Sequence, residues 1–323
     1  MSPQVPLRGR FAPSPTGALH AGSLLTATAS YLNIRQAGGE WLLRIEDIDS
    51  PRTVKGADRE ILTALEAFGF EWQGEVTYQS RRHALYLDAL QTLQQKNQLY
   101  PCRCSRKTLK LRRQQHASPL LQENPYPGYC RQQPLTSLQV KDAALRLRCG
   151  DVSIDFADLI QGSHRHRLQE QYGDFILRRR DGYYAYQLVV VVDDLEQGIT
   201  EVVRGADLLP TTAAQIYLRH QLMPQQPPPH FAHLPLLTNQ LGEKLSKMSR
   251  ADALNPACAV PTLWQILQIL GQQPPVELLD GDLNALWRWG VANWQLRKIP
   301  QTRQLIYDSF QVNDLCRMPL MIH

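Results

Sequence analysis

Blocks of hydrophobic positions, separated by polar and glycine- or proline-rich stretches, predict strands and helices in turn along the first part of the chain. Pro13, Pro15 and Gly17 follow a short, partly apolar stretch, which is typical of a strand that runs into a tight loop. The predicted strands are residues 7–11 and 41–45, and the predicted helices are residues 23–36 and 54–68. This alternation favours an α/β domain whose parallel sheet binds a ligand at the carboxyl ends of its strands.

The pattern changes after a further predicted helix at residues 81–96. Cysteines, basic clusters and prolines interrupt the following stretch, which we interpret as a module inserted into the α/β domain. Alternation then returns with an almost entirely apolar stretch at residues 183–192, which we interpret as a strand. The remaining predicted elements are helices at residues 209–221, 262–270 and 282–294 and a strand at residues 233–237.

The composition is that of an ordinary globular protein, because 43% of the 323 residues are hydrophobic and 20% are charged. A collagen, a disordered tail and a disulfide-dense secreted module are therefore excluded. The longest unbroken apolar run, residues 188–192, is far shorter than the roughly 20 residues that cross a bilayer. The N-terminus contains no apolar segment of the kind found in secretory signals. We therefore expect a cytoplasmic protein with no membrane partner.

The net charge of +5 is modest, but it is unevenly distributed along the chain. Six of the eleven residues from 103 to 113 are basic and none is acidic, and further basic groups lie at residues 164–167 and 178–180. Such clusters are a common electrostatic signature of proteins that bind a polyphosphate such as RNA. A solvated helix face is the alternative interpretation of the first cluster.

One loop carries residues suited to a nucleotide, although no G-x-x-x-x-G-K-[ST] pattern is present and no G-x-G-x-x-G pattern follows a strand. The loop P-S-P-T-G-A-L-H-A-G-S, residues 13–23, leads into a predicted helix N-terminus, where unpaired N–H groups and the helix dipole favour an anion such as a triphosphate. His20 can donate a hydrogen bond there, and Gly22 leaves room for a flat base. A helix cap or a surface position is the commoner role of a lone histidine.

A second loop, G-E-K-L-S-K-M-S at residues 242–249, follows the predicted strand at residues 233–237. Lys244 and Lys247 can place ammonium groups on a polyphosphate and stabilise the charge that develops as pyrophosphate leaves. Alone, this pattern is usually a solvated loop. The histidine-containing loop far earlier in the chain makes a nucleotide site the stronger interpretation.

With these two loops in this order, the chain resembles the class I aminoacyl-tRNA synthetases. Their HIGH-type motif is here H-A-G-S at residues 20–23, and their KMSKS-type motif is K-L-S-K-M at residues 244–248. The second motif departs from the family pattern in its second and fifth positions but keeps the lysine at Lys247. Three further segments resemble the glutamyl branch of the family: residues 8–17, 42–49 and 202–209. The resemblance implies a Rossmann-like catalytic domain.

The resemblance also implies roles for individual residues. It places His20, Gly22, Lys244 and Lys247 in catalysis, and it places His20, Gly22 and Lys247 at ATP, which binds with Mg²⁺. The residues that it places around glutamate are Arg10, Phe11, Ala12, Pro13, Ser14, Glu46, Tyr186 and Arg204. A guanidinium is a planar fork that matches a carboxylate, so Arg10 and Arg204 suit the acidic side chain of this substrate. Surface or salt-bridged arginines are the alternative interpretation.

Three cysteines in the inserted module indicate a metal site. Cys102 and Cys104 form a Cys-x-Cys pair, and with Cys130 they can hold Zn²⁺ when a fourth ligand closes the tetrahedron. The residues alone leave three candidates for that ligand: Tyr126, His116 and Tyr129. The zinc-binding insertion of some glutamyl-type enzymes implies the first of these, and with it one structural zinc per chain. Three unrelated buried thiols are the alternative.

The number of residues that follow the second loop indicates which branch of the family the chain resembles. Only 75 residues follow Met248, whereas an anticodon-binding domain needs on the order of 100 or more. We therefore expect no such domain, and the chain resembles the truncated paralogues called glutamyl-Q tRNA(Asp) synthetases. That resemblance implies a monomeric ligase that activates L-glutamate with ATP and transfers it to queuosine in the wobble position of tRNA(Asp).

The expected organisation has four parts. Residues 1–100 and 183–250 form the two halves of the catalytic domain, residues 101–182 form the inserted acceptor-binding module with its zinc site, and residues 251–323 form a helical stem-contact region and tail. Three rival functions remain open. They are a minimal glutamyl-tRNA synthetase that charges the 3′ end of tRNA(Glu), a non-catalytic RNA-binding paralogue and a small-molecule adenylyltransferase.

Overall fold

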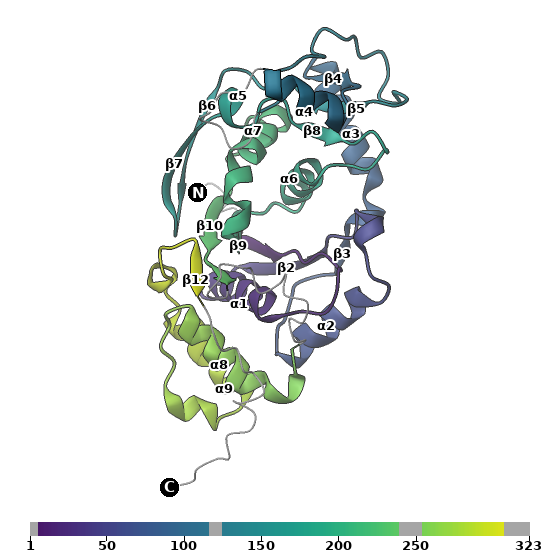
Figure 1. The fold of residues 1–323 in the computed structure, drawn as a ribbon. Helices are drawn as coiled ribbons and strands as arrows, with labels where there is room; N and C mark the ends of the chain where they lie inside the picture. The colour runs from purple at the N-terminus through teal and green to yellow at the C-terminus, as the bar shows by residue number, and fades with distance from the viewer. Residues whose placement is uncertain (1–5, 116–124, 239–253, 307–323) are drawn as a thin grey trace.

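A seven-stranded sheet forms the centre of the protein (Figure 1). The computed structural model describes residues 6–115, 125–238 and 254–306. The strand order is β3–β2–β1–β9–β10–β6–β7, and every pairing is parallel except that of the β6–β7 hairpin. These strands are β1 (Arg8–Phe11), β2 (Glu40–Ile45), β3 (Thr77–Tyr78), β6 (Ser153–Asp158), β7 (Gly162–Arg167), β9 (Glu201–Gly205) and β10 (His230–Leu234). The predicted α/β class with a largely parallel sheet is confirmed.

The strand order reverses at β1, because β2 and β3 extend the sheet on one side of it and β9 and β10 extend it on the other. The chain leaves β1 and enters α1 (Ala21–Arg35), which packs closely along the sheet. A Cβ atom on Gly9 would lie 2.4 Å from Cγ1 of Ile34, so glycine is required for this approach. In open α/β sheets, ligands bind in the crevice outside such a reversal point.

Helices cover both faces of the sheet, as Figure 1 shows. On one face, α1 packs with α2 (Ala57–Ala67), α8 (Ala259–Ile269) and α9 (Leu283–Asn293). Tyr31, Trp41, Phe70 and Trp287 form an aromatic cluster there, with ring centroids 4.9 to 5.5 Å apart. On the other face lie α3 (His83–Gln95), α6 (Tyr186–Glu196) and α7 (Thr212–Leu222). The two layers exclude water from both faces of the central strands.

The predicted strand at residues 183–192 is wrong, since the chain forms α6 from Tyr186 onward. All residues from Leu188 to Asp194 are buried, because the helix packs against α3, α7 and β8. A helix that is buried on all sides has the same unbroken apolar run as a buried strand, so periodicity alone could not separate them. This correction matters for the site, because Tyr186 now begins a helix and two buried aspartates lie near its end.

The other predicted elements are confirmed, with small shifts of their boundaries. The predicted strand at residues 233–237 is divided at Pro235 into β10 and β11 (Leu236–Thr238), and β11 pairs with β12 (Gln304–Ile306). Short 3₁₀ helices occupy Ser50–Arg52, Gln79–Arg81, Ala206–Thr211, Pro256–Cys258, Val276–Leu279 and Leu296–Lys298. Within the described ranges, no helix is long and apolar enough to span a membrane.

The cysteine-containing part of the chain forms a small antiparallel sheet of β4 (Leu99–Cys102), β5 (Ala144–Leu147) and β8 (Ile176–Arg178). The helices α4 (Arg106–Gln115) and α5 (Leu168–Gln171) accompany it. The β6–β7 hairpin lies between β5 and β8 in the sequence but joins the central sheet beside β10. This part of the chain is therefore tied to the central sheet by backbone hydrogen bonds as well as by its two connections.

The fully buried Asp174 holds this part together. Its carboxylate accepts hydrogen bonds from the Tyr100 hydroxyl at 2.5 Å, from Arg131 Nε at 2.6 Å and from the Cys149 backbone N–H at 2.7 Å. Burial of a carboxylate is unfavourable unless such partners replace water. The carboxylate of Asp174 therefore connects the three segments that contain Tyr100, Arg131 and Cys149.

We predict that Asp174→Asn lowers the free energy of unfolding by about 3 kcal/mol, because it leaves the partly buried guanidinium of Arg131 without its carboxylate. Thermal and urea unfolding of the full chain measure this change. Asp155→Asn is the matched control, since Asp155 pairs with Arg165 at the exposed surface of the β6–β7 hairpin and its loss should change nothing measurable. Equal effects of the two substitutions would contradict the prediction.

Candidate active site

A cavity of about 890 Å³ opens at the carboxyl ends of β1, β2 and β9. It is lined by the loop between β1 and α1, by Glu46 after β2, by Tyr186 at the start of α6 and by Arg204 in β9. The other predicted glutamate-binding residues, Arg10, Phe11, Ala12, Pro13 and Ser14, line the same cavity, and so do His20 and Gly22. The structure thus brings together residues that the sequence separates by almost 200 positions.

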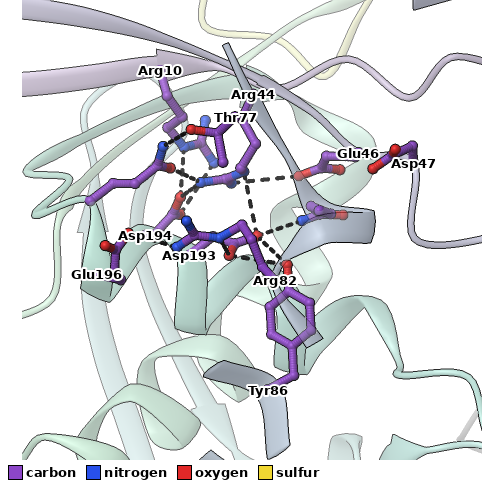
Figure 2. Close-up of polar contacts among 12 residues, drawn as sticks. Arg10, Arg44, Glu46, Asp47, Thr77, Arg82, Tyr86, Asp193, Asp194 and Glu196 are labelled. Carbon is purple, nitrogen blue, oxygen red and sulfur yellow. Dashed lines mark hydrogen bonds and ion pairs between the residues drawn. The ribbon is translucent and has the colours of Figure 1, made fainter. Parts of the chain in front are cut away.

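Asp194 of α6 holds the guanidinium of Arg10. Arg10 Nε lies 3.2 Å from Oδ1 of Asp194 and Nη2 lies 3.4 Å from Oδ2, so the aspartate contacts the Nε and Nη2 edge of the guanidinium (Figure 2). Both side chains are buried. Burial alone would raise the pKa of Asp194, but the guanidiniums of Arg10 and Arg44 outweigh it and keep that pKa below its ordinary value. Asp194 is therefore a carboxylate at neutral pH.

A second buried arginine, Arg44 of β2, lies behind this pair. Its Nη1 is 2.9 Å from Asp194 Oδ1 and 2.6 Å from the Gln197 side-chain oxygen, and its Nη2 is 3.5 Å from Glu46 Oε1. Figure 2 shows Arg44 at the centre of a network that continues to Asp193. Because three carboxylates surround it, its pKa is raised even though burial opposes its charge.

Asp193 anchors the far end of this network to the start of α3. It accepts hydrogen bonds from Arg82 Nε at 2.7 Å, from Gln79 Nε2 at 2.8 Å and from the Tyr86 hydroxyl at 3.0 Å (Figure 2). Alternating charges therefore run from the cavity wall into the protein interior. Such a network keeps its geometry only while every member has a partner.

Glu46 and Tyr186 add an acceptor and a donor to the cavity. Burial raises the pKa of Glu46, and the charges of Arg44 and Arg10 oppose that rise. A bound ammonium would favour the ionised form of Glu46 further. Burial also raises the pKa of Tyr186 to about 12, with Glu46 adding to the rise, so its hydroxyl keeps its proton at neutral pH and can donate a hydrogen bond.

Arg204 is held on the same type of edge as Arg10. Its Nε donates to Nε2 of His233 at 2.9 Å and its Nη2 donates to Oγ1 of Thr212 at 2.9 Å. In both arginines, Nε and one N–H of Nη2 therefore already donate to protein groups. The other edge of each guanidinium, formed by Nη1 and Nη2, can bind both oxygens of an incoming carboxylate. Two buried guanidiniums in one cavity favour an acidic ligand.

His20 is the N-cap of α1, so the alternative that the sequence raised for it is confirmed as a structural role. Its Nδ1 accepts hydrogen bonds from the N–H groups of Gly22 at 3.1 Å and Ser23 at 3.3 Å. A neutral imidazole that accepts at Nδ1 carries its proton on Nε2. The cap therefore sets the tautomer in which Nε2 is a donor, and the Ser23 hydroxyl lies 3.2 Å from that nitrogen. A Cβ on Gly22 would lie 3.2 Å from the imidazole ring, a tight contact that glycine avoids.

Lys244 and Lys247 lie outside the described residues. The described residues nearest to them in the sequence belong to the cavity region: Leu237 lines the cavity, and the backbone N–H of Leu254 donates to the carbonyl of Leu19 at 3.2 Å. The two lysines remain candidates on the strength of the sequence pattern.

Three thiols and one phenol meet beside the end of β4 in the small antiparallel sheet. The sulfur atoms of Cys102, Cys104 and Cys130 all lie within 4.8 Å of one another, and those of Cys104 and Cys130 are 3.6 Å apart. The Tyr126 hydroxyl lies 3.4 Å from the Cys102 sulfur and 3.8 Å from the Cys104 sulfur. The ligands of a tetrahedral Zn²⁺ with 2.3 Å bonds to sulfur are about 3.7 Å apart, so this donor set fits a metal ion.

Of the other two candidates for the fourth position, Tyr129 is 42% exposed and packs its ring edge-on against that of Tyr126. His116 lies outside the described residues. The backbone N–H of Cys130 donates to the Tyr126 oxygen at 3.0 Å, and the Arg146 guanidinium lies 3.8 Å over the Tyr126 ring. Both contacts favour negative charge on that oxygen, and they oppose burial and the neighbouring thiols, which together raise the pKa of Tyr126.

Sequence reasoning missed the residues that hold Arg10 and Arg204 and the charged network behind Arg10. Asp193, Asp194, Thr212 and His233 carry no motif by themselves, and Arg44 lay in a recognised segment without an assigned role. One signal was available. Two aspartates directly follow a fully apolar run, and acidic residues at the end of a buried element need cationic partners.

Comparisons with known proteins agree with this architecture. Residues 6–255 match the family described as tRNA synthetases class I (E and Q), catalytic domain. The glutamate-tRNA synthetase of Elizabethkingia anophelis has a similar fold, with a TM-score of 0.75 at 24% identity over 96% of this chain and 70% of that one. The match extends beyond the residues that form the cavity. The fold is therefore that of a class I synthetase catalytic domain.

Curated relatives narrow the family. The glutamyl-Q tRNA(Asp) synthetase of Chromobacterium violaceum is 50% identical over 293 residues, which cover 91% of this chain and 95% of that protein. The protein of the same name from Neisseria meningitidis is 49% identical over 300 residues, with 91% and 97% covered. The chain belongs to the glutamyl-Q tRNA(Asp) synthetase family within the class I tRNA synthetases.

We predict that Asp194→Asn destabilises the fold by about 3 kcal/mol at pH 7, because two buried guanidiniums lose a shared carboxylate. The native pKa of Asp194 is lowered, so its stabilising effect is present above the ordinary pKa of about 4 and is lost as the pH falls through the native value. The difference in melting temperature between the unaltered and altered chains should therefore shrink in acid.

Thermal melts from pH 7 down to the acid limit of the folded protein measure this difference. Asp181→Asn, which removes one partner of an exposed ion pair with Arg179, should leave the melting temperature unchanged. A gap for Asp194→Asn that stays constant over the whole pH range would contradict the prediction.

Proposed function

We propose that this protein activates L-glutamate with ATP and transfers the glutamate to queuosine in the wobble position of tRNA(Asp). The observation that carries the proposal is the pair of buried arginines, Arg10 and Arg204, in a cavity that Glu46 and the start of α1 also line. The names of the curated relatives support the amino acid and the acceptor. We also propose that the protein works as a monomer in the cytoplasm.

The cavity residues match the charges of glutamate. The substrate has two carboxylates and one ammonium group, and among the groups that line the cavity are the two buried guanidiniums of Arg10 and Arg204, the Tyr186 hydroxyl and the Glu46 carboxylate. Arg204 and Arg10 take the acidic groups, while Glu46 accepts from the ammonium group. Glutamine lacks the side-chain charge, and a buried arginine left without its carboxylate costs roughly 2–5 kcal/mol. The same residues therefore bind glutamate and exclude glutamine.

The N-terminus of α1 suits the phosphates of ATP. The positive end of its dipole lies beside the cavity, and His20 caps the N–H groups of Gly22 and Ser23 there and carries its proton on Nε2, 3.2 Å from the Ser23 hydroxyl. Gly22 faces the base, and Lys247 and Lys244 neutralise the leaving pyrophosphate, with Mg²⁺ bound to the phosphates. The cavity residues Phe11, Ala12, Pro13 and Ser14 connect the two halves of the site.

The reaction then needs no nucleophile from the protein. A substrate α-carboxylate oxygen attacks the α-phosphorus of ATP, the bond to pyrophosphate breaks, and glutamyl-adenylate forms. A hydroxyl of the acceptor nucleoside next attacks the activated carbonyl, AMP leaves, and the hydroxyl proton is released. Positioning and electrostatic stabilisation by the residues above provide the rate enhancement.

We predict that the protein charges tRNA(Asp) with labelled glutamate only when the tRNA carries queuosine and ATP is present. The assay compares tRNA(Asp) with and without queuosine and tRNA(Glu). Charging of tRNA(Glu) alone would overturn the proposal in favour of a minimal glutamyl-tRNA synthetase. Absence of glutamate-dependent ATP–pyrophosphate exchange would favour a non-catalytic RNA-binding protein.

We also propose that Cys102, Cys104, Cys130 and Tyr126 hold one structural Zn²⁺ that supports the small antiparallel sheet. The spacing of the four donor atoms supports this assignment. The ion would act by cross-linking β4 to the segment around Cys130, and it takes no part in the chemistry of the cavity. The basic helix α4, which begins at Arg106, directly follows Cys104 and Ser105, so the site also fixes a surface suited to RNA.

We predict about one zinc per chain in protein purified without chelator, as measured by elemental analysis. Tyr126→Phe should release zinc to a competing chelator at least about tenfold more readily, because it removes one ligand oxygen and keeps the ring. Tyr129→Phe is the matched control and should behave as the unaltered chain. Less than a tenth of a zinc per chain would contradict the assignment, and equal behaviour of the two variants would exclude Tyr126 as the fourth ligand.

A further inference from the structure

His233 of β10 lies behind the guanidinium of Arg204, at the Nε edge and opposite the Nη1 and Nη2 edge that is available to a ligand. Arg204 and His233 are register partners on adjacent parallel strands, and both side chains are buried. Nε2 of His233 accepts the hydrogen bond from Arg204 Nε at 2.9 Å. The pairing of β9 with β10 therefore sets this contact.

Asp158, at the end of β6, fixes His233 in turn. Its Oδ2 lies 2.5 Å from His233 Nδ1, and its Oδ1 accepts the backbone N–H of His233 at 3.1 Å. An imidazole that donates at Nδ1 to a carboxylate and remains neutral has its lone pair on Nε2. Asp158 thus selects the tautomer that can accept from Arg204.

Burial keeps the imidazole of His233 neutral. Burial lowers the pKa of His233 to about 4, with the Arg204 guanidinium and His164 adding to the decrease and Asp158 opposing it. Burial would raise the pKa of Asp158, but its hydrogen bonds from His233 and Gln161 outweigh this and lower the pKa. The neutral imidazole and the ionised aspartate are therefore the stable forms at the pH of the reaction.

We propose that Asp158 and His233 are positioning residues that hold the fork of Arg204 toward the side-chain carboxylate of glutamate and so determine the discrimination against glutamine. This inference rests on the function proposed above. A guanidinium held at Nε and at Nη2 cannot turn about its long side chain, so its remaining fork is oriented before substrate arrives.

A simple packing role does not account for these residues. If the only role of His233 were to fill space, an apolar side chain would do so and would need no buried aspartate beside it. Burial of the ionised Asp158 is unfavourable unless a partner or a function compensates for it. Asp158 also accepts the N–H groups of Ile160 at 3.0 Å and Gln161 at 2.8 Å in the β6–β7 turn. The same carboxylate thus connects the hairpin of the cysteine-containing part to the proposed glutamate site.

Two substitutions of similar size separate positioning from packing. The amide of Gln reaches the place of Nε2, so His233→Gln keeps an acceptor for Arg204, whereas the amide of Asn reaches only the place of Nδ1, so His233→Asn keeps the donor to Asp158 and leaves Arg204 Nε without an acceptor. The assay is glutamate-dependent ATP–pyrophosphate exchange by the full chain, with KM measured for glutamate and for ATP and with glutamine as a competing substrate.

His233→Asn should raise the KM for glutamate roughly tenfold to hundredfold and lower the preference for glutamate over glutamine by a similar factor. The KM for ATP should stay within about twofold, since His233 does not line the cavity near α1. His233→Gln should recover most of the lost glutamate affinity. Equal effects of the two variants, or a parallel rise in both KM values, would overturn the positioning role.

Folding of each variant is checked by its melting temperature. If His233→Asn does not fold, Asp158→Asn is measured in its place, because it permits the wrong tautomer of His233 at nearly unchanged size. It should raise the KM for glutamate and leave the KM for ATP unchanged, and an unchanged KM for glutamate would overturn the inference. No exchange by the unaltered chain would overturn the proposed function and this inference together, whereas exchange with a glutamate KM common to all variants would overturn this inference alone.

Discussion

The carboxylate of Asp194 lies between the guanidiniums of Arg10 and Arg44, and the geometry of the cavity depends on this contact. It joins β1, β2 and α6, which are far apart in the sequence. A buried guanidinium without a carboxylate partner would destabilise the fold by several kcal/mol, so neither arginine could occupy its position without the aspartate. The contact offsets the unfavourable burial of these charges and places a cationic group in the wall of the cavity.

The two buried arginines of the cavity are oriented in the same way, although their partners differ. Arg10 is held by a carboxylate from a helix, and Arg204 is held by a neutral imidazole and a hydroxyl. In both cases the occupied edge points into the protein and the remaining fork is available to a ligand. Such orientation before binding lowers the entropic cost of recognising a carboxylate. When an uncharged analogue binds, the buried arginine is left without a carboxylate partner.

Most of the fold followed from the hydrophobic pattern, and the exception is instructive. Helix α2 is confirmed because its buried residues Ala57, Ile61 and Leu65 recur at helical spacing, which leaves a readable period. Helix α6 has no such period, since α3, α7 and β8 surround its apolar residues. Its sequence was therefore equally consistent with a buried strand, and only its neighbours decide between them.

By itself, the sequence determined the family, the loop that caps α1 and the residues expected to face the substrate, because motifs are local and their chemistry is carried by residue types at short spacing. The tertiary structure alone decided which edges of Arg10 and Arg204 are occupied, which tautomers His20 and His233 adopt, and which tyrosine hydroxyl lies among the three thiols. Each of these depends on a hydrogen bond or contact whose partner is set by the folded backbone. The type of a residue determines whether its side chain can donate or accept a hydrogen bond. Only the packing of the folded chain determines which atom is its partner.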